Sequence, residues 1–197
     1  MLAPAIVAGL VVAGVASWSG AAPSIFSAEA VRSGSVDCIG ALAPGTYHDV
    51  KVPSGKTCTI DNTDVIKHDV RVDANATLND AGASIGHDVI AEKGSQLNIG
   101  PSGGYTGTNA SIGHNLDAQK ASAVQITTTK IGHDLRVVKS EGSVSITSNS
   151  IGHDMHVQGN GGSTTVTGNS VGHDADCKDN ADFVGGGNTA GHADSCN

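Results

Sequence analysis

A short phrase centred on histidine recurs through the chain at a nearly constant period, and this repeat constrains the fold more than any other feature. Successive copies are separated by 20, 19, 27, 19, 20, 20 and 19 residues. Eight of the nine histidines belong to it: His48, His68, His87, His114, His133, His153, His173 and His192. A fixed period near twenty is typical of a solenoid, in which each repeat buries its apolar face only against neighbouring repeats.

Aliphatic residues accompany the histidines at alternating positions, two before and two after most of them. Spacing by twos is the period of a strand with one buried face. A second short strand is indicated seven to nine residues before the histidine, as at Val144 and Ile146. Gly, Asn and Ser lie between these strands and suit corners. We therefore predict an all-β fold, a single-stranded parallel β-helix of about eight coils, for which the right hand is the commoner outcome.

The first thirty residues differ from the rest. An apolar run over 3–16 is followed by small residues that end in Ala28-Glu29-Ala30, which predicts a secretory signal peptide over 1–30. The first basic residue is Arg32, after the apolar run, so an uncleaved membrane anchor is the alternative. We expect an N-terminal cap over 31–45 and the β-helix domain over 46–197.

Only the interval between His87 and His114 breaks the period. The surplus residues, 100–107, predict an insertion loop on one face of the solenoid. Such a loop is either functionless or a binding loop, and Tyr105 is the candidate binding residue.

The four cysteines agree with the repeat. Two lie ten residues before a histidine and two lie four residues after one, so each pair occupies equivalent positions on adjacent coils. Vertical neighbours about 4.8 Å apart fall within the Cα separation that a disulfide allows. Of the three pairings, we predict Cys38 with Cys58 and Cys177 with Cys196. Disulfides are typical of an oxidising compartment, and together with the leader they favour a secreted or cell-surface protein.

The phrase Ile-Gly-His-Asp-Leu-x-Val, preceded by Asn-Ser at 149–150 and 169–170, resembles coils of secreted bacterial parallel β-helix proteins that read roughly Asn-Thr-Val-Gly-Gly-Asn-Leu-x-Cys. The resemblance covers residues 45–197, and the closing segment from Cys177 to Cys196 is similar too. It implies a fold and no activity. This chain departs from the pattern by placing His where the second Gly usually stands.

The net charge of −8 argues against a nucleic-acid partner, which would need clustered Lys and Arg. An acidic surface favours cations, or it serves only solubility.

In a regular stack the histidines would form one file and the residues that follow them another. The second file contains Asp49, Asp69, Asp88, Asp134, Asp154 and Asp174, and is interrupted by Asn115 and Ala193. Strict alternation would turn the imidazoles inward, whereas the glycine before most of them indicates a corner, which we favour. Imidazole suits Zn, Cu and Ni, with carboxylate as a common companion, so the two files together are the candidate metal ligands.

Three functions remain open from the sequence. The sharpest is a non-catalytic solenoid that binds divalent transition-metal ions. The second is a structural or surface/matrix interaction protein whose ladder only stabilises coil stacking. The third is a polysaccharide-active enzyme, which we do not expect because catalysis needs one asymmetric constellation and this motif is repeated eight times. The expected partners are metal ions or a cell-surface or matrix component, and a membrane only if the leader is retained.

Overall fold

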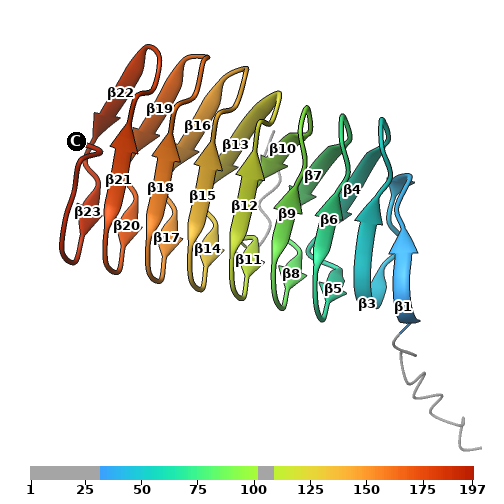
Figure 1. Ribbon diagram of the computed structural model, residues 1–197. Coiled ribbons are helices and arrows are strands. Elements are labelled where there is room, and N and C mark those ends of the chain that lie inside the picture. Colours follow the sequence, from blue (N-terminus) through green and yellow to red (C-terminus); the bar gives the residue numbers. More distant parts are fainter. Residues whose placement is uncertain (1–31, 102–108) are drawn as a thin grey trace, which may run out of the picture.

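A computed structural model describes residues 32–101 and 109–197 as a parallel β-solenoid of about seven turns (Figure 1). The expected fold class is confirmed, with about seven turns in place of the expected eight or so. The predicted signal peptide, most of the predicted insertion loop and Tyr105 lie outside the described residues. Within the described ranges, no helix has the length and apolar character needed to cross a bilayer.

Each full turn has three short strands, so the strands form three parallel stacks (Figure 1). The first stack follows the histidines and contains β1 (Arg32–Asp37), β3 (Gly45–Val52), β6 (Val70–Val72), β9 (Val89–Ala91), β12 (Leu116–Gln119), β15 (Leu135–Val138), β18 (Met155–Gln158) and β21 (Ala175–Lys178). The second contains β2 (Gly40–Ala41), β4 (Thr57–Asp61), β7 (Thr77–Ala81), β10 (Gln96–Ile99), β13 (Ala123–Thr127), β16 (Val144–Thr147), β19 (Thr164–Thr167) and β22 (Phe183–Gly186).

The third stack immediately precedes the histidines. It contains β5 (Asp64–Ile66), β8 (Ser84–Ile85), β11 (Ser111–Ile112), β14 (Lys130–Ile131), β17 (Ser150–Ile151), β20 (Ser170–Val171) and β23 (Thr189–Ala190). The long strand β3 joins it to the first stack, because its first half pairs with β5 and its second half with β6. Every histidine of the repeat after His48 therefore lies at the corner between a strand of the third stack and one of the first.

The core is made of vertical files of aliphatic side chains. Ile131 pairs in register with Ile112 below it and Ile151 above it, and all three are buried. Leu135 and Met155 form a similar pair across the corner. Each fully buried aliphatic side chain contributes roughly 1.5–3 kcal/mol. The period-two pattern of the sequence thus places its apolar residues inside, as expected.

Buried asparagines satisfy the backbone at another corner. Asn169 Oδ1 accepts hydrogen bonds from the Asn149 backbone N–H at 2.9 Å and from Asn149 Nδ2 at 3.0 Å. Asn169 Nδ2 in turn donates to the Ile146 carbonyl at 2.9 Å. Buried polar groups are tolerated when paired in this way, and these amides hold successive coils in one register.

The glycine of the phrase is required by close backbone stacking. A Cβ on Gly132 would lie 2.1 Å from the Gly113 carbonyl oxygen, and one on Gly152 would lie 2.0 Å from the Gly132 oxygen. Neither distance is compatible with a side chain. The corner before each of these histidines therefore stacks backbone directly on backbone.

Both expected disulfides are formed, one at each end of the stack. Cys38 is bonded to Cys58 with a Cα separation of 5.4 Å, and Cys177 to Cys196 with 5.0 Å. In the described residues no cysteine is free. Vertical registry of one period therefore holds for residues far from the histidines as well.

Candidate metal-binding site

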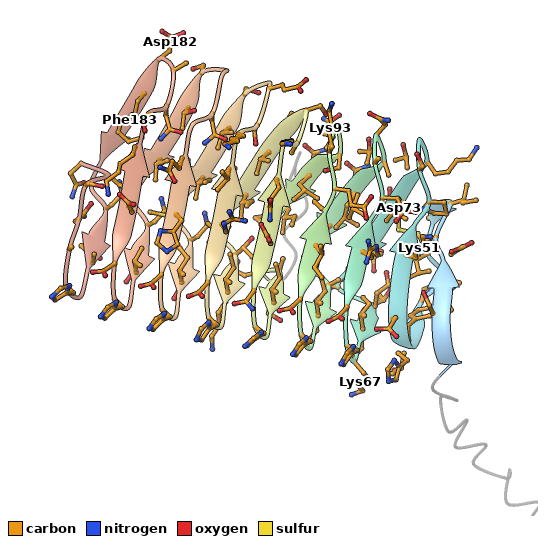
Figure 2. The ribbon with its side chains drawn as sticks, in the orientation of Figure 1. Lys51, Lys67, Asp73, Lys93, Asp182 and Phe183 are labelled. Atoms are coloured by element: carbon orange, nitrogen blue, oxygen red, sulfur yellow. A yellow bond between two sulfur atoms is a disulfide. The ribbon has the colours of Figure 1, made fainter. Side chains whose placement is uncertain are left out.

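The eight repeated histidines form a continuous stack of rings, here called the histidine ladder. Neighbouring ring centroids are 4.8–5.3 Å apart and their planes differ by 2–27°. Figure 2 shows this row of rings along one edge of the solenoid, beside Lys67. The side chains are 44–72% exposed, so the rings project outward from the corner as expected from the preceding glycine.

The backbone sets the spacing of the ladder. The N–H of His153 donates to the His133 carbonyl at 3.0 Å, and the N–H of His173 donates to the His153 carbonyl at 2.9 Å. Each histidine is therefore held directly over the one before it. The corner interrupts the alternation of the flanking strands, which explains why the rings face solvent although they are spaced by twos from buried aliphatic residues.

The residues after the histidines form a second file, here called the aspartate file, and each carboxylate joins two coils. Asp154 Oδ1 accepts from His173 Nδ1 at 3.0 Å and from the Asp174 backbone N–H at 3.0 Å. Its Oδ2 lies 3.3 Å from Nδ1 of His153 in its own coil. The same arrangement recurs at Asp49, Asp69, Asp88, Asp134 and, with Ala193 as the backbone donor, Asp174.

These contacts determine which ring nitrogen carries the proton. Nδ1 of His173 lies between Asp154 Oδ1 and Asp174 Oδ2, at 3.0 and 3.3 Å. A nitrogen between two carboxylate oxygens must be a donor, so the neutral ring is protonated on Nδ1 and carries its lone pair on Nε2. An imidazole oriented by a carboxylate on one nitrogen is the usual arrangement of a metal-ligating histidine.

Asn115 replaces a carboxylate in the middle of the aspartate file. Its Oδ1 accepts from His133 Nδ1 at 3.2 Å and from the Asp134 backbone N–H at 3.1 Å, so it keeps the coil-to-coil bonds. Its Nδ2 lies 2.8 Å from His114 Nδ1. His114 is left with one carboxylate contact, to Asp88 Oδ1 at 2.9 Å. Asn115 therefore removes one negative charge from the aspartate file, while the histidine rings on either side stay stacked.

Five carboxylates of the aspartate file have a lowered pKa, which favours the charged form: Asp49, Asp88, Asp134, Asp154 and Asp174. Burial by itself would raise the pKa of Asp88, but the bonds from the Asn115 backbone and the His114 ring lower it below its ordinary value. The pKa of Asp134 is lowered in the same way, against the effect of burial, by the Asp154 backbone and the His153 ring. The pKa of His87 is raised by its hydrogen bond to Asp69. A negative file thus lies behind the exposed rings.

The ladder contains His–Asp–His groups that could hold an ion, such as His133, Asp134 and His153, whose candidate ligand atoms all lie within 4.8 Å of one another. An ion placed between Nδ1 and the carboxylates would have to displace the Nδ1 proton and the backbone N–H that shares Oδ1. An ion on Nε2 leaves every one of these bonds in place. The donor set therefore fits coordination by Nε2, with the aspartates as orienting groups.

Every histidine and aspartate predicted from the sequence is found in the two files. His156 is on β18 outside the ladder, with Nε2 4.0 Å from Asp154 Oδ2. Sequence reasoning missed two buried carboxylates, Asp64 and Asp80, which are 2% and 1% exposed. The signal for Asp80 was available, because it stands in register between Ile60 and Ile99 in an otherwise aliphatic file.

Protein-family models, curated proteins and solved structures were each compared with this chain, and none matches it.

Proposed function

We propose that this solenoid is a non-catalytic protein whose histidine ladder binds divalent transition-metal ions, Zn, Cu or Ni, through Nε2. The observation that carries the proposal is the contact of Nδ1 with two aspartates at His68, His87, His153 and His173, which leaves the Nε2 lone pair free on these rings. Neutral imidazole is a common ligand for these three metals.

The surroundings favour cations over other ligands. The chain carries a net charge of −8, and the aspartate file directly behind the rings adds a local negative potential. Two divalent ions about 5 Å apart repel by roughly 3 kcal/mol even in water. We therefore expect ions on alternate rings of the ladder, with a weak to moderate affinity at each site.

The disulfides also bear on the compartment in which the protein acts. Two disulfides close the ends of the stack and are typical of oxidising compartments. We propose that the protein is secreted or displayed at a cell surface, where an exposed array of imidazoles would meet extracellular metal.

A second candidate function is favoured by one observation. Each carboxylate such as Asp154 bonds the ring and the backbone of the following coil, so the ladder also stabilises coil stacking. In this alternative, the protein is a structural or matrix component and the rings bind nothing.

The test is a titration of the full-length, oxidised and metal-free chain with zinc, copper and nickel at pH 7.5. Calorimetry, melting temperature and bound-metal analysis are the readouts. We expect more than one ion per chain and a rise in melting temperature. The double variant His133→Ala/His153→Ala removes two adjacent rings and should lower the bound metal.

The matched control is His156→Ala, which removes an exposed imidazole that is not part of the ladder. It should bind as much metal as the unmodified chain. If metal-free protein takes up no ion while the double variant melts at a lower temperature, the ladder is purely structural.

A further inference from the structure

The spacing of the ladder prevents neighbouring rings from sharing one ion. Adjacent centroids are at least 4.8 Å apart, and the rings are nearly parallel, so adjacent Nε2 atoms are separated by about the same distance. Zn–N bonds of about 2.0–2.1 Å allow two nitrogens on one ion to be at most about 4.2 Å apart, and about 3.3 Å in tetrahedral geometry. The Nδ1 contacts with aspartate oppose the rotation that would close this gap.

An ion bound to the ladder therefore has one protein ligand and several open positions. Zinc sites in proteins usually take at least three protein ligands, so such a site is incomplete within a single chain. We propose that the ladder of a second copy of this chain supplies a second imidazole to each ion, with water in the remaining positions, and that metal joins two solenoids side by side along their histidine edges. This inference rests on the proposed metal binding through Nε2.

The ladder has the shape that such a joint requires. Its rings repeat at 4.8–5.3 Å along the whole stack, so two ladders have matching periods. In an antiparallel pair, the twofold axis would pass between His114 and His133, and each of these rings would face the other in the second copy. A twofold contact is closed, which predicts a dimer and excludes a growing filament.

The flanks of the ladder leave room for a second copy. The positions that immediately precede the rings are glycine from Gly86 onward, and the Cβ distances show that no side chain fits there. The two other positions are Tyr47, which is buried, and Lys67, which is exposed at the same corner near one end of the row (Figure 2). The rings are therefore the most prominent groups along this edge.

Charge makes the association dependent on metal. Two chains of charge −8 repel each other, and the aspartate files would lie behind the rings on both sides of the joint. Bound cations offset the repulsion, and several ions on two rigid files act together as a multivalent link.

The experiment is sedimentation velocity on the full-length oxidised chain, metal-free and then with added zinc, followed by chelation with EDTA. We expect a monomer without metal, a twofold increase in mass with zinc, and reversal by EDTA. X-ray absorption of the zinc-loaded sample should show two or more imidazoles per ion. His156→Ala should dimerise normally, and His133→Ala/His153→Ala should require more zinc.

The possible results distinguish failure of this inference from failure of the proposed function. Zinc that binds by calorimetry to a chain that stays monomeric, with one imidazole per ion, overturns the inference and leaves metal binding intact. Assemblies that grow beyond a dimer also contradict the twofold pairing. Failure to bind zinc at all overturns both.

Discussion

Asp80 provides a quantitative test of the packing described above, because it is a carboxyl group in a file of aliphatic side chains. Its Oδ1 accepts from the backbone N–H groups of Gly82 and Ala83 at 2.9 and 2.8 Å, while its buried Oδ2 has no hydrogen-bond partner. Burial raises the pKa of Asp80 from 3.8 to about 6, with a smaller contribution from the nearby charge of Asp64. The perturbation is Asp80→Asn, which keeps the shape and cannot ionise.

Proton linkage gives the direction in which the free energy of unfolding changes with pH. Between pH 3.8 and about 6 the folded protein holds a proton on Asp80 that the unfolded chain has released, so the free energy of unfolding falls as the pH rises. A difference of about two pKa units, at 1.36 kcal/mol each, corresponds to a loss of about 3 kcal/mol by neutral pH. Asp80→Asn removes this loss, although its amide N–H groups also lack partners.

The assay is urea unfolding of the oxidised chain and of Asp80→Asn at a series of pH values from 4 to 8. The free energy of unfolding of the variant, relative to the unmodified chain, should increase by about 2.5 kcal/mol between pH 4 and neutral pH. Hydrogen bonds from Thr63 lower the pKa of Asp61, so Asp61→Asn is a control whose effect on stability should stay nearly constant between pH 4 and 8. A difference between Asp80→Asn and the unmodified chain that is constant with pH would refute the reasoning.

Three further predictions concern the stack. Gly132→Ala places a Cβ 2.1 Å from a backbone oxygen and should destabilise the fold by about 1–3 kcal/mol or more in chemical denaturation. His87 should titrate above pH 6.5 by NMR, because its hydrogen bond to Asp69 raises its pKa. The contribution of this contact to stability is therefore complete below pH 6.5 and is lost as the pH rises through the folded pKa. Asp69→Asn should lower the pKa of His87, and an unchanged titration would contradict the contact. Replacing Cys177 and Cys196 together by serine should lower the free energy of unfolding by about 2–4 kcal/mol, and a melting temperature equal to that of the parent would contradict a stabilising role for this bond.

Much of the fold could be predicted from the sequence because the contacts repeat at one sequence period. The backbone N–H of His153 donates to the carbonyl of His133, twenty positions earlier, so the sequence repeat and the hydrogen-bond repeat have the same period. The same reasoning placed Cys177 over Cys196. Aliphatic residues spaced by twos then identified the inner face.

The orientation of the rings could not be fixed in this way. Alternation along a strand predicts that a residue two positions from Ile151 shares its buried face, yet His153 faces solvent because the backbone turns at Gly152. The double contact of each aspartate was also out of reach, because sequence adjacency suggests only the ring of its own coil. The burial of Asp80 could have been predicted from its position in register with Ile60 and Ile99, but it was missed because a carboxyl group by itself suggests an exposed residue.

The double contact of each aspartate also makes the ladder modular. Asp134 serves His133 in its own coil and His153 in the next, so each coil brings one ring and one acceptor and needs only an identical neighbour. Duplication of a whole coil would lengthen the array by one donor without disturbing any existing bond, and even the surplus residues between His87 and His114 leave those two rings stacked at 4.8 Å. The number of imidazole donors in such a protein is therefore set by how many coils its gene encodes, and it can change in whole steps while the fold stays the same.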